Sequence, residues 1–227
     1  MNESDRIQQE WHQRTCLKGE TLCLLPQRAI YWPAQQALLL ADPHLGKAAH
    51  FRRHGVPVSG AVMQRDLDTL SHLVAQWQPQ HLYFLGDLFH SQYNREWERF
   101  CAWMAAFAGQ GYLVRGNHDI LRPAHYEAAR LTLIEGYHDL GPFRLIHELP
   151  DPEACDADTP YCLAGHVHPG VALNGGGRQR LKLPCFHFGT RGGLLPAFGQ
   201  FTGLYLIQPQ EADQVFVVVE DRVLQVA

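Results

Sequence analysis

The stretch QALLLADPHLGK (residues 36–47) joins a run of apolar residues to the polar pair Asp42 and His44. Two later stretches have the same form, HLYFLGDL (81–88) and GYLVRGNHD (111–119). Short apolar runs that stop at glycine or polar residues are typical of buried strands. Between them, residues 59–78 and 94–108 carry apolar side chains at helical spacing. The first half of the chain therefore predicts a βαβαβ arrangement.

The second half of the chain is rich in strand-like segments and poor in helical ones. Two short strands are also expected at 20–32, ahead of the first stretch. The later candidates are residues 131–135, 143–147, 161–166, 180–188, 203–208 and 214–226. Together the two halves predict an α/β fold of two packed sheets flanked by helices. At 227 residues, we expect the whole chain, 1–227, to form a single domain.

Composition narrows the class of protein. Hydrophobic residues make up 46% of the chain, yet no run approaches the roughly 18 apolar residues that cross a membrane. The first ten residues, MNESDRIQQE, are polar and do not resemble a signal peptide. The six cysteines include no C-x-x-C pair, so a zinc ribbon or a thioredoxin-like site is not expected. We expect a soluble, cytoplasmic protein with free thiols.

The net charge of −4 argues against a globally basic nucleic-acid binder, but the charges are segregated. No acid lies between Asp42 and Asp66, or from Thr159 to Gln210, whereas both stretches contain lysine and arginine. Chance together with solvated faces would explain this segregation of charge, and a surface that attracts phosphate would explain it equally well. The sequence leaves both interpretations open.

Polar residues that can bind metal follow the expected strands. Asp42 and His44 are two apart, and Pro43 favours an extended Asp42, so both side chains are expected to point the same way. Open α/β sheets place their sites at the carboxyl ends of strands. The residues at these ends are Asp42, His44, Asp87, Asn117, His118, Asp119, His147, His166 and His168.

The expected ligand set comprises two carboxylates, one amide oxygen and four imidazoles. This is too many for one tetrahedral zinc ion, but enough for two divalent ions that share a bridging carboxylate. The absence of cysteine ligands argues against a soft-metal or iron–sulfur site. Glycine precedes Asp87, Asn117 and His166, which removes side-chain bulk where backbone must crowd a metal cluster.

In this order, the motifs Asp42-x-His44, Gly86-Asp87, Gly116-Asn117-His118-Asp119, His147 and Gly165-His166-x-His168 resemble those of the calcineurin-like metallophosphoesterases. The resemblance implies a four-layer α/β/β/α sandwich with a binuclear metal centre. It implies that Asp42, His44 and His168 bind one ion, that Asn117, His147 and His166 bind the other, and that Asp87 bridges. It also implies that His118 contacts the scissile phosphate and that Asp119 orients the His118 ring.

A narrower resemblance covers most of the chain from about residue 36. The segments 41–55, 85–91, 113–119, 165–171, 183–186 and 195–203 are similar to the bacterial ligase-associated DNA damage response endonucleases of the PdeM group, relatives of the SbcD repair nucleases. This implies a Mn-dependent DNA endonuclease in DNA repair that acts on single-stranded or irregular DNA, in a pathway shared with a DNA ligase and a helicase. Manganese is the expected metal, with iron or zinc as alternatives.

Two divalent ions lower the pKa of a bridging water towards neutrality, so hydroxide is expected to attack the phosphodiester while His118 assists. Arg52, Arg53 and Arg191 are candidates for phosphate contacts, with a solvated surface as the alternative. Phe198 or Phe201 could stack on a base, although core packing is the simpler explanation. The role of His90 is open, with a hydrogen bond to a metal ligand as the default expectation.

Two other functions fit the same residues. The substrate could be a small nucleotide or a phosphoprotein, because the chemistry of phosphoester cleavage does not fix the substrate. The chain could also be a metal-stabilised binding subunit without turnover, although the complete ligand set and His118 argue against this. The metal identity, the oligomeric state and the role of the first 20 residues do not follow from the sequence.

Overall fold

A computed structural model describes residues 12–47, 61–151, 158–174, 180–200 and 202–227. Its first sheet has seven strands in sequence order, antiparallel from β1 to β4 and parallel from β4 to β7. The strands are β1 (Gln13–Leu17), β2 (Glu20–Leu25), β3 (Ala29–Trp32), β4 (Ala37–Leu40), β5 (His81–Leu85), β6 (Gln110–Val114) and β7 (Leu131–Ile134).

The second sheet is also mixed, with the strand order β14-β11-β12-β13-β10-β9-β8, and β15 joins it at β12. Strands β9, β10 and β13 are parallel to one another. The strands are β8 (Tyr137–Leu140), β9 (Phe143–Ile146), β10 (Tyr161–Ala164), β11 (Pro169–Asn174), β12 (Arg180–Gly189), β13 (Gly192–Leu194), β14 (Tyr205–Leu206), β15 (Gln214–Val219) and β16 (Arg222–Gln225).

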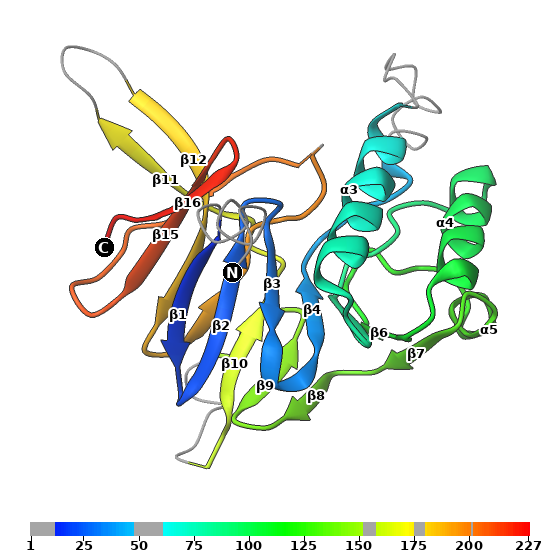
Figure 1. Cartoon of the computed structure of the whole chain (residues 1–227), viewed down its shortest axis with the longest axis horizontal. Helices are drawn as coiled ribbons and strands as arrows, with labels where there is room; N and C mark the ends of the chain where they lie inside the picture. Colours follow the sequence, from blue (N-terminus) through cyan, green and yellow to red (C-terminus); the bar gives the residue numbers. More distant parts are fainter. Residues whose placement is uncertain (1–11, 48–60, 152–157, 175–179, 201) are drawn as a thin grey trace, which may run out of the picture.

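The described helices lie on one side of the first sheet (Figure 1). They are α3 (Ala61–Trp77), α4 (Arg95–Ala106) and α5 (Pro123–Ala128), whereas the short 3₁₀ helix η1 (Pro33–Gln35) only connects β3 to β4. The Asn94 side chain caps α4 by accepting hydrogen bonds from the amides of Glu96 and Trp97. No described helix crosses to the second sheet, so the described residues do not form the expected outer helical layer there. The two packed sheets confirm the expected fold class.

The apolar run of β4 is continuous because both faces of the strand are buried. Leu38 and Leu40 pack with the helices in one core cluster, whereas Leu39 packs with the second sheet in another. A strand that is covered on both faces needs apolar residues at every position. The expected strand at 36–42 is therefore confirmed, and its carboxyl end opens at the junction of the two sheets.

Two expectations from composition can be compared with the structure. The cysteines in the described part of the chain are free, and Cys23, Cys162 and Cys185 are buried. Among the described helices, none has the length and apolar character needed to span a bilayer.

Candidate metal centre

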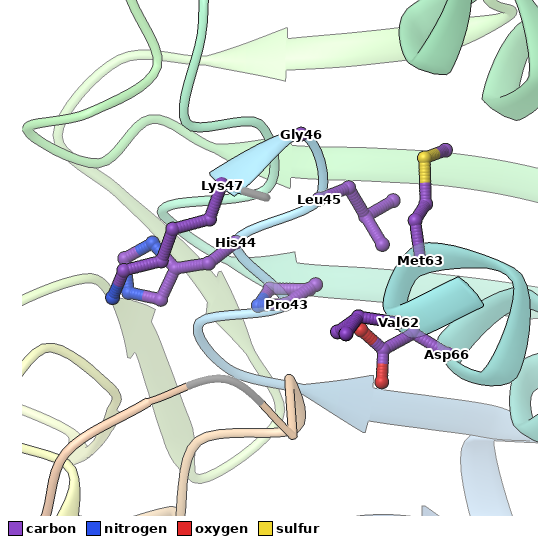
Figure 2. A pocket seen from close by; sticks show the side chains of 8 residues that line it. All are labelled: Pro43, His44, Leu45, Gly46, Lys47, Val62, Met63 and Asp66. Atoms are coloured by element: carbon purple, nitrogen blue, oxygen red, sulfur yellow. The ribbon is translucent and has the colours of Figure 1, made fainter. Parts of the chain in front are cut away.

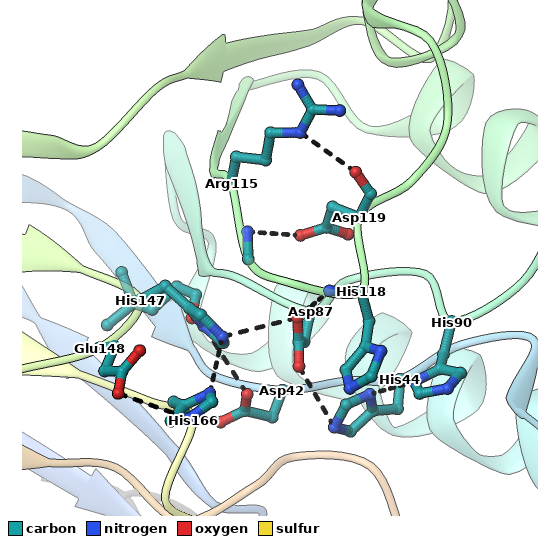
Figure 3. A network of polar contacts seen from close by, with 12 residues as sticks. Asp42, His44, Asp87, His90, Arg115, His118, Asp119, His147, Glu148 and His166 are labelled. Atoms are coloured by element: carbon teal, nitrogen blue, oxygen red, sulfur yellow. Dashed lines mark hydrogen bonds and ion pairs between the residues drawn. The ribbon is translucent and has the colours of Figure 1, made fainter.

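Five strands from both sheets bring their carboxyl ends to one place. Strands β4, β5 and β6 of the first sheet are parallel neighbours, and so are β9 and β10 of the second. The backbone amide of His44 donates to the carbonyl of Asp87, and that of Gly165 donates to the carbonyl of His147. Figure 3 shows the side chains that follow these strands pointing toward one another.

The first cluster contains Asp42, His44 and His168, with one potential ligand atom of each within 4.8 Å of the others. The Nε2 atoms of His44 and His168 are 3.2 Å apart, and His168 Nε2 is 3.7 Å from Asp42 Oδ1. These are the three residues that the family resemblance assigns to one ion.

The second cluster contains Asp87, His147 and His166, which meet the same 4.8 Å condition. His147 Nε2 lies 3.2 Å from His166 Nδ1 and 3.5 Å from Asp87 Oδ1. The carbonyl of Leu85 lies 3.0 Å from His147 Nδ1, so a proton on Nδ1 would leave Nε2 free to bind metal. Asn117, the fourth residue that the resemblance connects with this ion, follows β6 and is exposed.

Asp87 belongs to the second cluster and also reaches the first. Its Oδ2 is 3.8 Å from His44 Nε2 in the first cluster, while its Oδ1 is 3.5 Å from His147 Nε2 in the second. Its Oδ1 also accepts a 2.8 Å hydrogen bond from the backbone amide of His118. A carboxylate with one oxygen toward each cluster has the placement that a bridging ligand needs.

The polar groups of the site fit bound cations. Asp42 is fully buried, and its Oδ1 has no hydrogen-bond partner among the described residues. A buried carboxylate oxygen without a hydrogen bond is unfavourable, and a cation at this position would offset that cost. Burial, reinforced by the nearby Lys47, lowers the pKa of His44 to about 2, so its ring is neutral and available as a ligand. Imidazole and carboxylate ligands suit borderline divalent metals.

The backbone at the ligands differs from the expectation of an extended Asp42-Pro43-His44 segment. Asp42 and His44 have φ angles of 50° and 46°, in the left-handed region, as have Asp87, His166 and His168. The expected convergence of Asp42 and His44 is present, but the extended backbone proposed to cause it is wrong. Tight turns after the strands aim these side chains, and non-glycine residues in such turns are typical of functional sites.

The glycines before the ligands are required by space, as the sequence predicts. A Cβ on Gly86 would collide with the His147 ring, and one on Gly116 would collide with Asp87. A Cβ on Gly165 would lie 2.5 Å from Asp42 Oδ2. Each strand end therefore approaches a candidate ligand from another strand, in two cases a strand of the other sheet, too closely for any side chain.

Gly165→Ala is expected to displace the Asp42 carboxylate, lowering the bound-metal content and destabilising the fold by about 1–3 kcal/mol. Metal analysis after dialysis measures the change in metal content, and urea unfolding measures the change in stability. Gly203→Ala is the matched control, since a Cβ there meets nothing within 4 Å. A Gly165→Ala protein with unchanged metal content would contradict the steric explanation.

His118 stands on the open side of the centre. Its side chain is exposed, and its ring lies 3.9 Å from that of His90, centroid to centroid. His90 Nδ1 is 3.3 Å from His44 Nδ1, so His90 contacts both a candidate ligand and the candidate catalytic residue. The contact with His44 agrees with the expected hydrogen bond to a metal ligand. The ring contact with His118, tilted by 32°, did not follow from the sequence.

Asp119 has partners other than the expected one. It is 2% exposed, and its two oxygens accept hydrogen bonds from the backbone amides of Gly116 at 2.9 Å and Phe89 at 3.1 Å. Burial raises the pKa of this carboxyl to about 7 against those hydrogen bonds. These contacts hold the loops after β5 and β6 together, and they do not support the expected role of Asp119 in orienting the His118 ring.

The remaining candidate residues divide into those that the structure does not describe and those that it places away from the centre. Arg52, Arg53 and Phe201 lie outside the described residues. Arg191 precedes β13, whose far end, Leu194, pairs with Ala164 at the site end of β10. Arg191 therefore lies at the opposite end of these strands from the metal centre. Phe198 is 5% exposed and belongs to the core, in agreement with the simpler explanation.

The structure adds two charged residues that the sequence did not mark as part of the site. Glu148 Oε1 lies 3.7 Å from His166 Nε2. In the sequence, only its position next to His147 could have indicated that Glu148 belongs to the site. The Lys47 side chain lies beside His44 in Figure 2. Burial lowers the pKa of Lys47, while Asp87 and Asp42 raise it. Both residues place charge at the rim of the centre.

A small cavity of about 10 Å³ lies behind His44, between the 43–47 loop and helix α3 (Figure 2). It has room for about one water molecule. Asp66 of α3 lines it and is 4% exposed. Burial raises the pKa of Asp66 to about 7, although the backbone amide of Gln200 and the charge of Arg28 oppose this.

Ionisation of Asp66 is therefore expected to destabilise the folded protein. The raised pKa means that the stability contributed by the protonated form is present in full below the unfolded value of 3.8 and is lost as the pH rises through about 7. Asp66→Asn removes this dependence, so wild type should lose stability relative to the variant between pH 5 and pH 8. Urea unfolding of both proteins at each pH measures it, and an equal difference at the two pH values would contradict the burial argument.

The fold and the centre define a metal-dependent phosphoesterase. The family model for calcineurin-like phosphoesterases matches residues 37–221, and the chain belongs to this family. The crystal structure of the Pseudomonas putida nuclease MPE is similar, with 33% sequence identity and a TM-score of 0.80, over 95% of this chain and 100% of that one. The chain matches no curated protein sequence.

A more distant structure is that of YfcE, a phosphoesterase from E. coli. It is 17% identical over 84% of this chain and 98% of its own, with a TM-score of 0.43. Similarity at this level bears on neither the substrate nor the site.

Proposed function

We propose that this chain is a phosphodiesterase that uses two divalent metal ions, with Mn²⁺ favoured, to cut DNA internally. The observation that carries the proposal is the pair of ligand clusters joined by Asp87, in a chain 33% identical to a nuclease along almost its whole length. Because of the resemblance to the PdeM group, the proposal also includes a role in DNA repair, in a pathway with a ligase and a helicase. It places the protein in the cytoplasm.

In this proposal Asp42, His44 and His168 hold one ion, Asn117, His147 and His166 hold the other, and Asp87 contacts both. Two ions in such a centre lower the pKa of a bound water and neutralise charge on the phosphate. The buried carboxylates of Asp42 and Asp87 keep the ligands aligned, because the backbone amides of His166 and His118 fix one oxygen of each at 2.8 Å.

His118 takes the catalytic role in the proposal. Its ring is exposed on the open side of the centre, where it can reach a phosphate oxygen or the leaving oxygen of a bound diester. In its protonated form it can donate a hydrogen bond to the phosphate or a proton to the departing alkoxide. His90, packed on the ring face, limits the positions that the His118 ring can take.

Circular single-stranded DNA tests the proposal directly, because it has no ends and only internal cutting linearises it. Protein stripped of metal with a chelator should leave the circles intact, and addition of Mn²⁺ should linearise them. A His118→Ala protein purified in the same way controls for contaminating nucleases. Rapid hydrolysis of a small nucleotide or a phosphopeptide with every DNA left intact would refute the substrate claim, and no turnover of any ester would favour a binding subunit.

A further inference from the structure

The second sheet extends past the metal centre as a two-stranded arm. Strand β11 begins at Pro169, directly after the candidate ligand His168, and pairs with β12 from Gly170–Pro184 out to Asn174–Arg180. The other half of β12 pairs with β13 and β15 inside the sandwich. Figure 1 shows the outer part of β11 and β12 projecting away from the body of the protein. The arm therefore starts at the centre and points outward.

Tyr205 is an exposed aromatic residue at the base of this arm. The short strand β14 adds to the edge of β11, with Tyr205 opposite Pro169. The Tyr205 backbone amide donates a 3.0 Å hydrogen bond to the carbonyl of His168. The side chain is 65% exposed, more than any other large hydrophobic side chain that the structure describes. The Tyr205 side chain is thus exposed on a residue whose backbone is hydrogen-bonded to a candidate ligand.

The arm also carries positive charge. Phe186 and Phe188 of β12 pack between the two sheets, whereas Leu183 and Cys185 belong to the cluster on the opposite face. Because side chains alternate along a strand, Lys182 continues the row of Phe186 on the side of the first sheet. Lys182 is exposed. From Thr159 to Gln210, a range that includes the arm and β14, the sequence has no Asp or Glu.

We propose that Tyr205 and the arm bind the strand of DNA next to the scissile phosphate, with Tyr205 stacking on a base and Lys182 contacting the backbone. The inference rests on the proposed function and adds the substrate contacts. Stacking on aromatic rings together with a basic surface is how proteins hold single strands without sequence preference. In a duplex the base faces are already stacked, so this surface favours single-stranded or unpaired DNA.

Tyr205→Ala is expected to raise KM for single-stranded DNA about tenfold or more and to leave kcat nearly unchanged. Tyr205→Phe should behave as wild type, since the ring is kept. Hydrolysis of bis(p-nitrophenyl) phosphate, which is too small to reach the arm, should be the same in all three proteins. Tyr137→Ala is the matched control, because Tyr137 is a half-exposed tyrosine on β8, the opposite edge of the same sheet.

Lys182→Glu should weaken DNA binding and lower the slope of log affinity against log salt by about one. An unchanged KM for DNA in Tyr205→Ala, equal losses in the Ala and Phe variants, or a parallel loss of small-diester hydrolysis would each overturn the inference and leave the proposed function standing. If wild type hydrolyses the small diester but cuts no DNA, the proposed function itself fails.

Discussion

Replacement of His118 by alanine is expected to lower kcat for diester cleavage by about 10²–10⁴, the usual contribution of a positioned proton donor. The metal content should stay at the wild-type value, because the His118 ring belongs to neither three-residue cluster. The fold should also persist, since the contact to Asp87 comes from the backbone amide of His118, which alanine retains. Single-turnover kinetics with metal analysis on the same preparation measure both effects.

The matched control is His72→Ala, which removes an exposed imidazole on helix α3 and should leave kcat and metal content unchanged. The dependence of kcat on leaving group adds a sharper test. If His118 protonates the leaving oxygen, the loss should be large for alkoxide leaving groups and small for p-nitrophenolate. A His118→Ala enzyme that retains wild-type kcat on DNA would remove His118 from the mechanism.

Asp87→Asn is expected to lower kcat about 10³-fold or more, because several kcal/mol of transition-state stabilisation depend on an intact pair of ions. The neutral amide keeps the shape of the side chain but removes the charge shared by the two clusters. We therefore expect fewer than two ions per chain after dialysis, with the weaker site lost first. Metal analysis together with calorimetric Mn²⁺ titration distinguishes one retained ion from two.

Asp68→Asn makes the same chemical change at an exposed position of α3 and should alter neither quantity. In Asp87→Asn the amide oxygen can still accept the hydrogen bond from the His118 amide, so a gross rearrangement of the loop after β6 is not expected. Two tightly held ions in Asp87→Asn would mean that Asp87 does not bridge, and the two clusters would have to be treated as independent sites.

Some strands could not be predicted from the sequence. The β8 segment YHDL alternates between exposed and half-buried positions and has no apolar face. Strands β11 and β13 begin with Pro169-Gly170 and Gly192-Gly193, residues that usually indicate turns. These strands form because the sheet supplies neighbours with unpaired backbone groups, which is a tertiary effect that local residue preference does not contain.

The buried strands and the set of residues at their carboxyl ends can be read from the amino-acid order alone. Each apolar run stops at its own Asp, Asn or His, and parallel strands must bring those ends to one edge. The chemistry of the candidate centre therefore follows from the order of residues such as Asp42, Asp87 and His147 along the chain.

The way these residues meet, and the basic and aromatic side chains that accompany them, depend on how distant segments pack. Left-handed turns at Asp42 and His44, backbone partners for Asp119, and the placement of Tyr205 beside His168 all depend on segments far apart in sequence. Arg191 illustrates the same limit, since its distance from the centre is set by the parallel pairing of β13 with β10. Pairing between distant strands fixes direction and register, and neither is encoded in the composition of a single strand.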